Sequence, residues 1–112
     1  MCEFTVYDKD DPSKRIAEDI VKATMKNGCL TIRKVLGDSM TLENAVILEV
    51  DVSKEQMIIS RLPFLGDIAK LVELFSNYRK DPSPTAYQKI VSQWEQAKSE
   101  GDSAVRSLKN KN

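Results

Sequence analysis

The hydrophobic pattern of this chain changes its period at residues 62–66. Before this point, apolar residues alternate with polar ones in short runs separated by turn residues, which is the period-two pattern of β-strands. After it, apolar residues recur every three or four positions, as they do on one face of an α-helix. We therefore predict a mainly β fold with an α-helical C-terminal extension. The β-domain (residues 1–62) should be a small antiparallel barrel or sheet of five to six strands, and the extension (residues 63–112) should contain two or three helices.

The strongest local signal in the β-region is the dipeptide Asn27-Gly28. Both residues tolerate the positive φ angles of a type I′ turn, so residues 20–26 and 29–35 are expected to form a β-hairpin. The charged segment 8–13, which contains a proline, is expected to be a turn or loop. The other predicted strands show the same alternation and cover residues 4–7, 40–42, 45–52 and 56–62.

The extension has the pattern of two amphipathic helices. Asp67 is expected at the N-cap or in the first turn of the first helix. Ser83 and Pro84 are expected at the N-cap and at the first position of the second helix, which Gly101 and Asp102 should interrupt. The interruption leaves room for a short third helix near the C-terminus.

Each of these helices must bury its apolar side against the β-domain, the other helix or a partner subunit. The second helix includes the aromatic residues Tyr87 and Trp94 in its apolar stripe. Such a stripe could dock another protein, but apolar residues at helical spacing are more often part of a core. We therefore expect the extension to pack on the β-domain or on a dimer partner.

The sequence contains no histidine. This removes the most common general base and metal ligand, and with it the catalytic sites in which a Ser or Cys nucleophile depends on His. The sequence also has no glycine-rich phosphate loop, Gly-x-Ser-x-Gly motif or EF-hand loop. Its two cysteines cannot form a tetrahedral Cys₄ zinc site within one chain. We therefore expect a binding protein and not an enzyme.

No run of residues approaches the roughly 18 apolar positions of a membrane-spanning helix. The N-terminal segment also lacks the basic start and apolar run of a signal peptide. We expect a cytoplasmic protein without membrane contact, in which thiols stay reduced, so that Cys2 and Cys29 need not form a disulfide. Cys29 follows the predicted hairpin turn, where a small buried thiol is the usual interpretation.

Cys2 offers the clearest metal chemistry in the chain. Removal of Met1 would leave Cys2 with a free α-amine and a thiol, which together form a five-membered chelate ring. A metal can deprotonate both groups at neutral pH, and backbone amide nitrogens can join the ligand set. Thiolate sulfur with such nitrogens favours square-planar Ni(II) or Cu(II), and two chains meeting at their N-termini would supply two sulfurs. The alternative is that Cys2 is simply a small residue at the start of a strand.

Residues 1–62 resemble the CooT-type small nickel-binding proteins, a family also labelled predicted RNA-binding protein. The resemblance lies in the order and spacing of Met1-Cys2, Val6-Tyr7, Glu18-Asp19-Ile20-Val21, Asn27-Gly28, Val35-Leu36-Gly37-Asp38, Ile47-Leu48-Glu49-Val50-Asp51-Val52 and Ile58-Ile59. It implies a small antiparallel β-fold, a homodimer, and Ni(II) held between the two copies of Cys2, with the Cys2 amine or the backbone nitrogen of Glu3 as partners. It also implies a role in nickel handling, with a nickel-handling protein as partner. The short members of the family lack the extension 63–112.

RNA binding is the alternative function. A modest basic set lies in the β-region, and part of it could share a face with Phe4 or Tyr7, as in surfaces that bind single strands. Acidic residues lie among these positions, and the chain as a whole carries no basic excess, with 17 residues of each sign. The candidate nucleic-acid-binding residues are Lys14, Arg15, Lys22, Lys26, Arg33 and Lys34.

Overall fold

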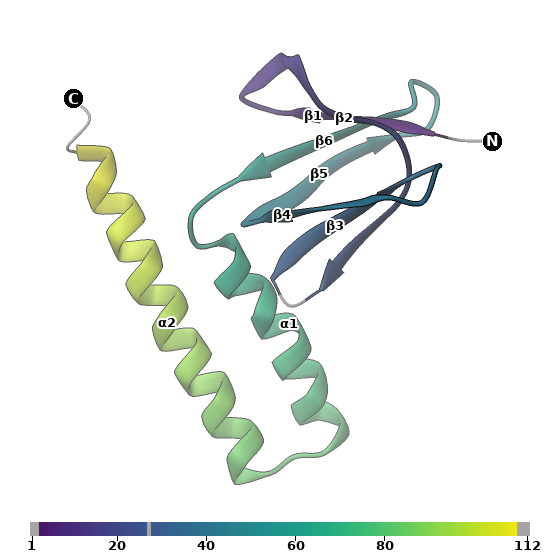
Figure 1. The fold of residues 1–112 in the computed structure, drawn as a ribbon. Helices are drawn as coiled ribbons and strands as arrows, with labels where there is room; N and C mark the ends of the chain where they lie inside the picture. Colours follow the sequence, from purple (N-terminus) through teal and green to yellow (C-terminus); the bar gives the residue numbers. More distant parts are fainter. Residues whose placement is uncertain (1–2, 27, 110–112) are drawn as a thin grey trace.

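The computed structural model describes residues 3–26 and 28–109 and shows a mainly β chain with two C-terminal helices (Figure 1). This confirms the predicted order of strands followed by helices. The elements are β1 (Phe4–Asp8), β2 (Asp11–Lys26), β3 (Cys29–Lys34), β4 (Ser39–Glu43), β5 (Ala45–Asp51), β6 (Gln56–Arg61), α1 (Leu65–Lys80) and α2 (Pro84–Lys109).

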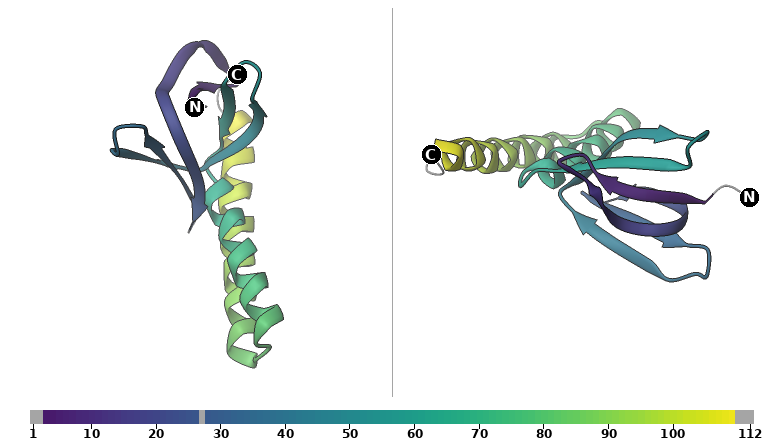
Figure 2. Two further views of the ribbon diagram at one scale, coloured as in Figure 1. Left: turned by 90° about the vertical axis from the view of Figure 1, so that its right-hand side faces the viewer. Right: turned by 90° about the horizontal axis from the view of Figure 1, so that it is seen from above.

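The six strands form one curved, open sheet in the order β4-β3-β2-β1-β6-β5 (Figure 2). Of the predicted antiparallel barrel or sheet of five to six strands, the sheet is confirmed. The barrel is wrong because the edge strands are not joined, and the pairing is not wholly antiparallel because β1 and β6 pair in parallel. The two edges, β4 and β5, are consecutive in the chain and are separated only by Asn44. Asn44 has a φ of 57°, which redirects the chain so that β5 leaves β4 and pairs with β6 instead.

Strand β2 is longer than expected and begins at Asp11, inside the segment predicted to be a loop. The reversal between β1 and β2 needs only two residues, because Asp8 already pairs with Asp11. The Asp8 side chain accepts a hydrogen bond from the backbone nitrogen of Asp10 at 2.9 Å, which stabilises this tight turn. Pro12 is tolerated because it lies at the exposed beginning of the strand.

The hydrophobic core lies on one face of the sheet. Its most deeply buried side chains come from four strands: Val6, Ile20, Leu30, Ile32 and Ile59. These residues occupy alternate positions, as the period-two pattern predicted. Among the residues that the structure describes, the core holds no buried polar side chain.

One corner of the molecule joins the β2–β3 hairpin to the start of α1. The hairpin is confirmed by the pairing of Lys26 with Cys29, although Asn27 lies outside the described residues. Gly28 has a φ of +79°, and a Cβ atom added to it would lie 2.5 Å from the carbonyl oxygen of Gly66. The Asn44 side-chain oxygen accepts a hydrogen bond from the Gly66 nitrogen at 2.9 Å. The hairpin turn therefore contacts the first turn of the helix directly.

The helix ends were partly predicted. In α1 the N-cap is Phe64, so Asp67 occupies the first turn and is not the cap. In α2 the Ser83 hydroxyl accepts a hydrogen bond from the Ala86 nitrogen at 3.0 Å, and Pro84 is the first helical residue, as expected. These local signals were read correctly because each depends on one side chain and the nearest backbone nitrogens.

The predicted interruption of the second helix at Gly101 and Asp102 is wrong, because α2 runs without a break to Lys109. A single glycine costs a helix only about 1 kcal/mol relative to alanine. Gly101 is also half-buried near the Phe64 ring, so this turn of the helix packs against the segment before α1.

The two helices form an antiparallel hairpin that extends away from the sheet (Figures 1 and 2). They contact each other, and the Gln93 side chain donates a hydrogen bond to the backbone oxygen of Asp67 at 2.8 Å. The sheet contacts the first turn of α1, where Gly28 and Asn44 meet Gly66. No helix in residues 3–26 and 28–109 is long and apolar enough to cross a membrane.

Candidate functional site

The first described residues of the chain are bound to the turn between β5 and β6. Cys2, the predicted metal ligand, lies outside the described residues. Its neighbour Glu3 donates a hydrogen bond from its backbone nitrogen to the Glu55 carboxylate at 3.3 Å. The Thr5 nitrogen donates to the backbone oxygen of Glu55 at 2.9 Å. The start of β1 is therefore held next to a carboxylate that the sequence did not indicate.

The β5–β6 turn is itself held in one conformation by Asp51. The Asp51 carboxylate accepts hydrogen bonds from the Ser53 hydroxyl at 2.7 Å and from the Lys54 nitrogen at 3.1 Å. These bonds, that of Ser53 first, lower the pKa of Asp51 below its ordinary value. Glu55 closes the turn with a φ of 53° and donates from its nitrogen to the Val52 oxygen at 3.2 Å. This geometry positions the Glu55 carboxylate at the start of β1.

Glu55 is a functional candidate that sequence reasoning missed. It is 52 positions away from Glu3, and the two meet only because β1 and β6 lie side by side in parallel. The hydrogen bond also bears on the expected role of the Glu3 nitrogen. An amide nitrogen that binds a metal must lose its proton. In this arrangement that proton points at Glu55, so the nitrogen must give up the bond to become a ligand.

A donor set of thiolate and nitrogen ligands at the start of β1 requires the thiolate of Cys2. Within residues 3–26 and 28–109, no group of three or more Cys, Asp or Glu side chains is arranged to hold a metal. At the start of β1, the described polar contact is the hydrogen bond from the Glu3 nitrogen to the Glu55 carboxylate.

Cys29 lies far from this end of the sheet. Its register partner on β2 is Lys26, whereas the partner of Phe4 is Ile20. Six residues of extended strand separate these partners, which corresponds to about 20 Å. Cys29 is a free thiol, half-exposed on the face opposite the core. The expectation of a fully buried thiol is therefore wrong, and Cys29 does not join the end of β1 within one chain.

The six basic candidates for RNA binding do not form one surface. Lys22 and Arg33 are register partners on the face opposite the core, and Lys26 lies on the same face. Lys34 pairs with the core residue Ile20 and so lies on the other face.

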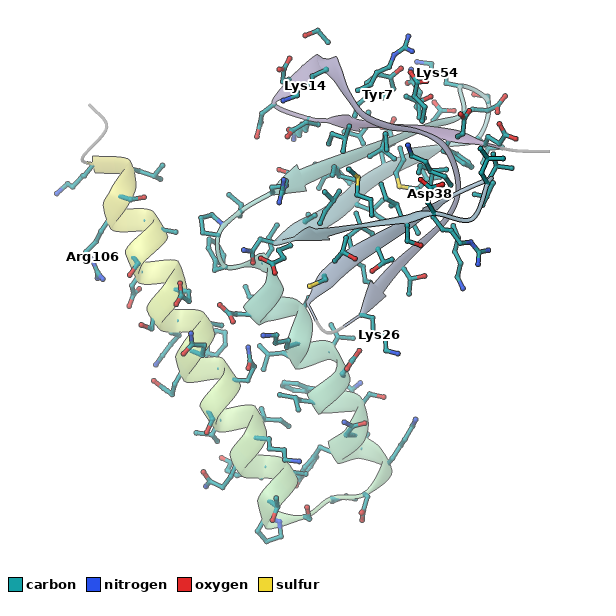
Figure 3. The ribbon with its side chains drawn as sticks, in the orientation of Figure 1. Tyr7, Lys14, Lys26, Asp38, Lys54 and Arg106 are labelled. Carbon is teal, nitrogen blue, oxygen red and sulfur yellow. The ribbon has the colours of Figure 1, made fainter. Side chains whose placement is uncertain are left out.

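The two remaining basic candidates lie toward the other end of β2. Figure 3 shows Lys14 beside Tyr7 and well separated from Lys26. Arg15 pairs with Tyr7 in the sheet and forms an ion pair with Glu18, which raises the pKa of Arg15. Its charge is therefore already partnered, and the basic residues divide into at least two groups.

These features together define a class of protein: a small open sheet in which the N-terminal strand is central, with a helical hairpin added after the last strand. Residues 1–60, more than half of the 112 residues, match the family model described as CO dehydrogenase accessory protein CooT. The chain therefore belongs to the CooT family, which confirms the resemblance found in the sequence. Comparison with curated proteins gave no match. The matched residues end inside β6, so both helices lie beyond them.

Proposed function

We propose that this chain is a nickel-handling accessory protein and not an enzyme, and that it holds Ni(II) through Cys2. Membership of the CooT family implies an accessory role for CO dehydrogenase, a nickel enzyme. The observation that carries the proposal is the fixed start of β1, where Glu3 and Thr5 are bound to the β5–β6 turn directly after Cys2. The absence of histidine supports a binding role over a catalytic one.

The ligands in this proposal are, from each chain, the Cys2 thiolate and the backbone nitrogen of Glu3, with the α-amine freed by removal of Met1 as the alternative nitrogen. In this role the bound Ni(II) would be the cargo of the protein and not a cofactor. Glu55 Oε2 is the acceptor to which the Glu3 N–H points, so the carboxylate holds the amide proton in the metal-free protein. Metal uptake then requires that this hydrogen bond be broken and the proton released.

A homodimer follows from the number of sulfur ligands. One chain offers a single thiol at this end of the sheet, because Cys29 is about 20 Å away along β2. Two copies that meet at their N-termini would supply two thiolates and two nitrogens. We expect this assembly to act in the cytoplasm, where thiols remain reduced, and to pass nickel to proteins that mature CO dehydrogenase.

The test is a Ni(II) titration of protein from which Met1 has been removed, as verified by mass spectrometry. Binding is monitored through the thiolate-to-nickel absorption bands. We expect one Ni(II) for every two chains and loss of the bands in Cys2→Ala. Cys29→Ala is the matched control, because it removes the other thiol and should leave uptake unchanged. Absence of nickel uptake by the mature protein, or equal uptake by Cys2→Ala, would refute the proposal.

RNA binding is the second candidate function. The observation in its favour is that Lys22, Lys26 and Arg33 share the exposed face of β2 and β3. Binding through these residues predicts an affinity for single-stranded RNA that falls steeply with salt and is lost in Lys22→Gln/Arg33→Gln. Lys14→Gln is the control, since Lys14 lies toward the far end of β2 (Figure 3).

A further inference from the structure

One side of the helical hairpin is apolar and is not covered by any described part of the chain. A hollow of about 450 Å³ runs between the helices on this side. It is lined by Leu71 and Phe75 of α1 and by Tyr87, Ile90, Val91 and Trp94 of α2. The aromatic residues keep much of their surface in solvent, since Phe75 is 44% exposed, Trp94 50% and Tyr87 55%. These aromatic side chains are therefore not buried within the chain itself, and their predicted burial against a dimer partner stays a prediction.

The apolar surface continues along α1 toward the sheet. Ile68 and Val72 lie about two turns and one turn before Phe75, respectively, and also line a second hollow of about 290 Å³ beside Met25 and Val46. Val72 is 71% exposed. We call the residues that line the hollow between the helices, together with Ile68 and Val72, the apolar hairpin surface.

The opposite side of the same hairpin is polar. There α2 presents Thr85, Gln88, Lys89, Ser92, Gln93 and Gln96, and α1 adds the half-buried Leu74. A two-helix layer with one polar and one apolar side resembles half of a four-helix bundle, in which the apolar sides of two layers face each other. Exposure to water is favourable for the polar side but not for the apolar side, so burial of the apolar side against a partner would stabilise the hairpin.

The total surface supports the same conclusion. The chain exposes 7899 Å², whereas a compact monomer of this mass should expose about 6,200 Å². Its radius of gyration is 16.5 Å, compared with about 13 Å for a compact chain of this length. The apolar hairpin surface offers on the order of 600 Å², close to the ~800 Å² that each partner buries in a standard-size interface. This area is appropriate for a moderately stable dimer.

We propose that the apolar hairpin surface binds a second copy of this chain through a two-fold axis, so that two hairpins form a four-helix bundle. A two-fold interface must be self-complementary, and an apolar surface with aromatic rings on one helix and aliphatic side chains on both meets this condition. Charge does not favour a strongly acidic or basic partner. The described residues that line the hollow between the helices are all uncharged, and the hollows along α1 add Lys26, Glu73 and Arg79, whose charges largely offset each other. Two copies also do not repel each other, since each has a formal charge of zero.

This interface is separate from the nickel-dependent contact proposed at Cys2. It involves residues 68–94, whereas the metal contact involves the start of β1. The hairpin dimer should therefore form without metal and without the Cys2 thiol. The two proposals can fail independently.

The experiment is sedimentation equilibrium of the full-length Cys2→Ala variant in the presence of a chelator, over a range of concentrations. We expect a dimer with a dissociation constant in the micromolar range. Val72→Glu should raise this constant at least about 100-fold, because a carboxylate would be buried without a partner. Ser92→Glu, on the polar side of α2, is the matched control and should remain a dimer.

Circular dichroism of each variant verifies that the helices are intact. A second measurement, on Cys2→Ala alone, is the fluorescence of Trp94, the only tryptophan, which should shift to longer wavelength as the dimer is diluted. Cys2→Ala that stays monomeric at all concentrations would overturn the proposal, whatever the nickel titration of the parent protein shows. A folded Val72→Glu variant that dimerises as tightly as the control would overturn it too.

Discussion

Replacement of Gly28 by alanine tests the contact that attaches the helical hairpin to the sheet. Gly28 has a φ of +79°, and an added Cβ would lie 2.5 Å from the Gly66 carbonyl oxygen. Gly37 provides the matched control, because its φ of +103° is also positive but a Cβ there meets nothing within 4 Å. The two substitutions therefore share the backbone strain and differ in the contact with α1.

The magnitude follows from these two parts. A positive φ costs alanine about 1–2 kcal/mol, from which the reduced entropy of the unfolded chain subtracts about 0.4–1 kcal/mol. Gly37→Ala should therefore destabilise the protein by about 1 kcal/mol. In Gly28→Ala the first turn of α1 must also move, which adds about 1–3 kcal/mol of overpacking. The same movement weakens the hydrogen bond from Gly66 to Asn44, worth about 1 kcal/mol.

The assay is urea unfolding of both variants at one protein concentration, followed by circular dichroism. The expected difference of at least about 2 kcal/mol corresponds to about 1 M in the urea midpoint if the slope is about 2 kcal/mol/M. Equal midpoints for Gly28→Ala and Gly37→Ala would refute the reasoning. That result would mean that the hairpin turn and the start of α1 are not in contact in solution.

Two further predictions concern the turn beside Cys2. Glu55→Gln should take up Ni(II) a few-fold more tightly and at lower pH than the parent, because it weakens a hydrogen bond worth about 1 kcal/mol that keeps the proton on the Glu3 nitrogen. Weaker Ni(II) uptake by Glu55→Gln would contradict this prediction and would indicate that the Glu55 carboxylate itself binds the metal. Glu43→Gln, which changes a carboxylate at the other end of the sheet, is the control. The pKa of Asp51 is lower in the folded than in the unfolded state. The ionised Asp51 carboxylate therefore stabilises the fold at pH values above its unfolded-state pKa, and this stabilisation is lost as the pH falls through its folded-state pKa. Thermal unfolding between neutral and acidic pH should therefore show a smaller loss of stability in Asp51→Asn than in the parent, and identical pH profiles would contradict the hydrogen bonds from Ser53 and Lys54.

Features that depend on neighbouring residues could be predicted from the sequence. The β2–β3 hairpin follows from one dipeptide, and the start of α2 follows from Ser83 and Pro84. The buried residues of β3 and β6 also fall at alternate positions, as expected for strands with the predicted period-two pattern. In each case the physical cause acts over only a few positions, so the pattern contains the necessary information.

Features that depend on distant residues could not be predicted. A period-two pattern shows that β1 and β6 are strands but not that they pair in parallel, so the approach of Glu55 to Glu3 was invisible. The redirection at Asn44 was equally hidden, because it depends on a single φ angle and on a helix that begins 21 residues later. Periodicity likewise predicted that Tyr87 and Trp94 have an apolar environment, but it could not show that the chain itself fails to provide one.

The position of β6 explains how one small chain can accommodate both proposed contacts. Glu55 precedes this strand and holds the start of β1, whereas α1 begins just after the strand ends. From Gln56 to Arg61 an extended strand spans about 17 Å. The start of β1 and the start of the helical hairpin therefore lie at opposite ends of β6. The family match ends at residue 60, near the end that leads into the hairpin. Dimerisation through the helices would leave the start of β1 uncovered, so this interface need not interfere with the metal binding proposed there.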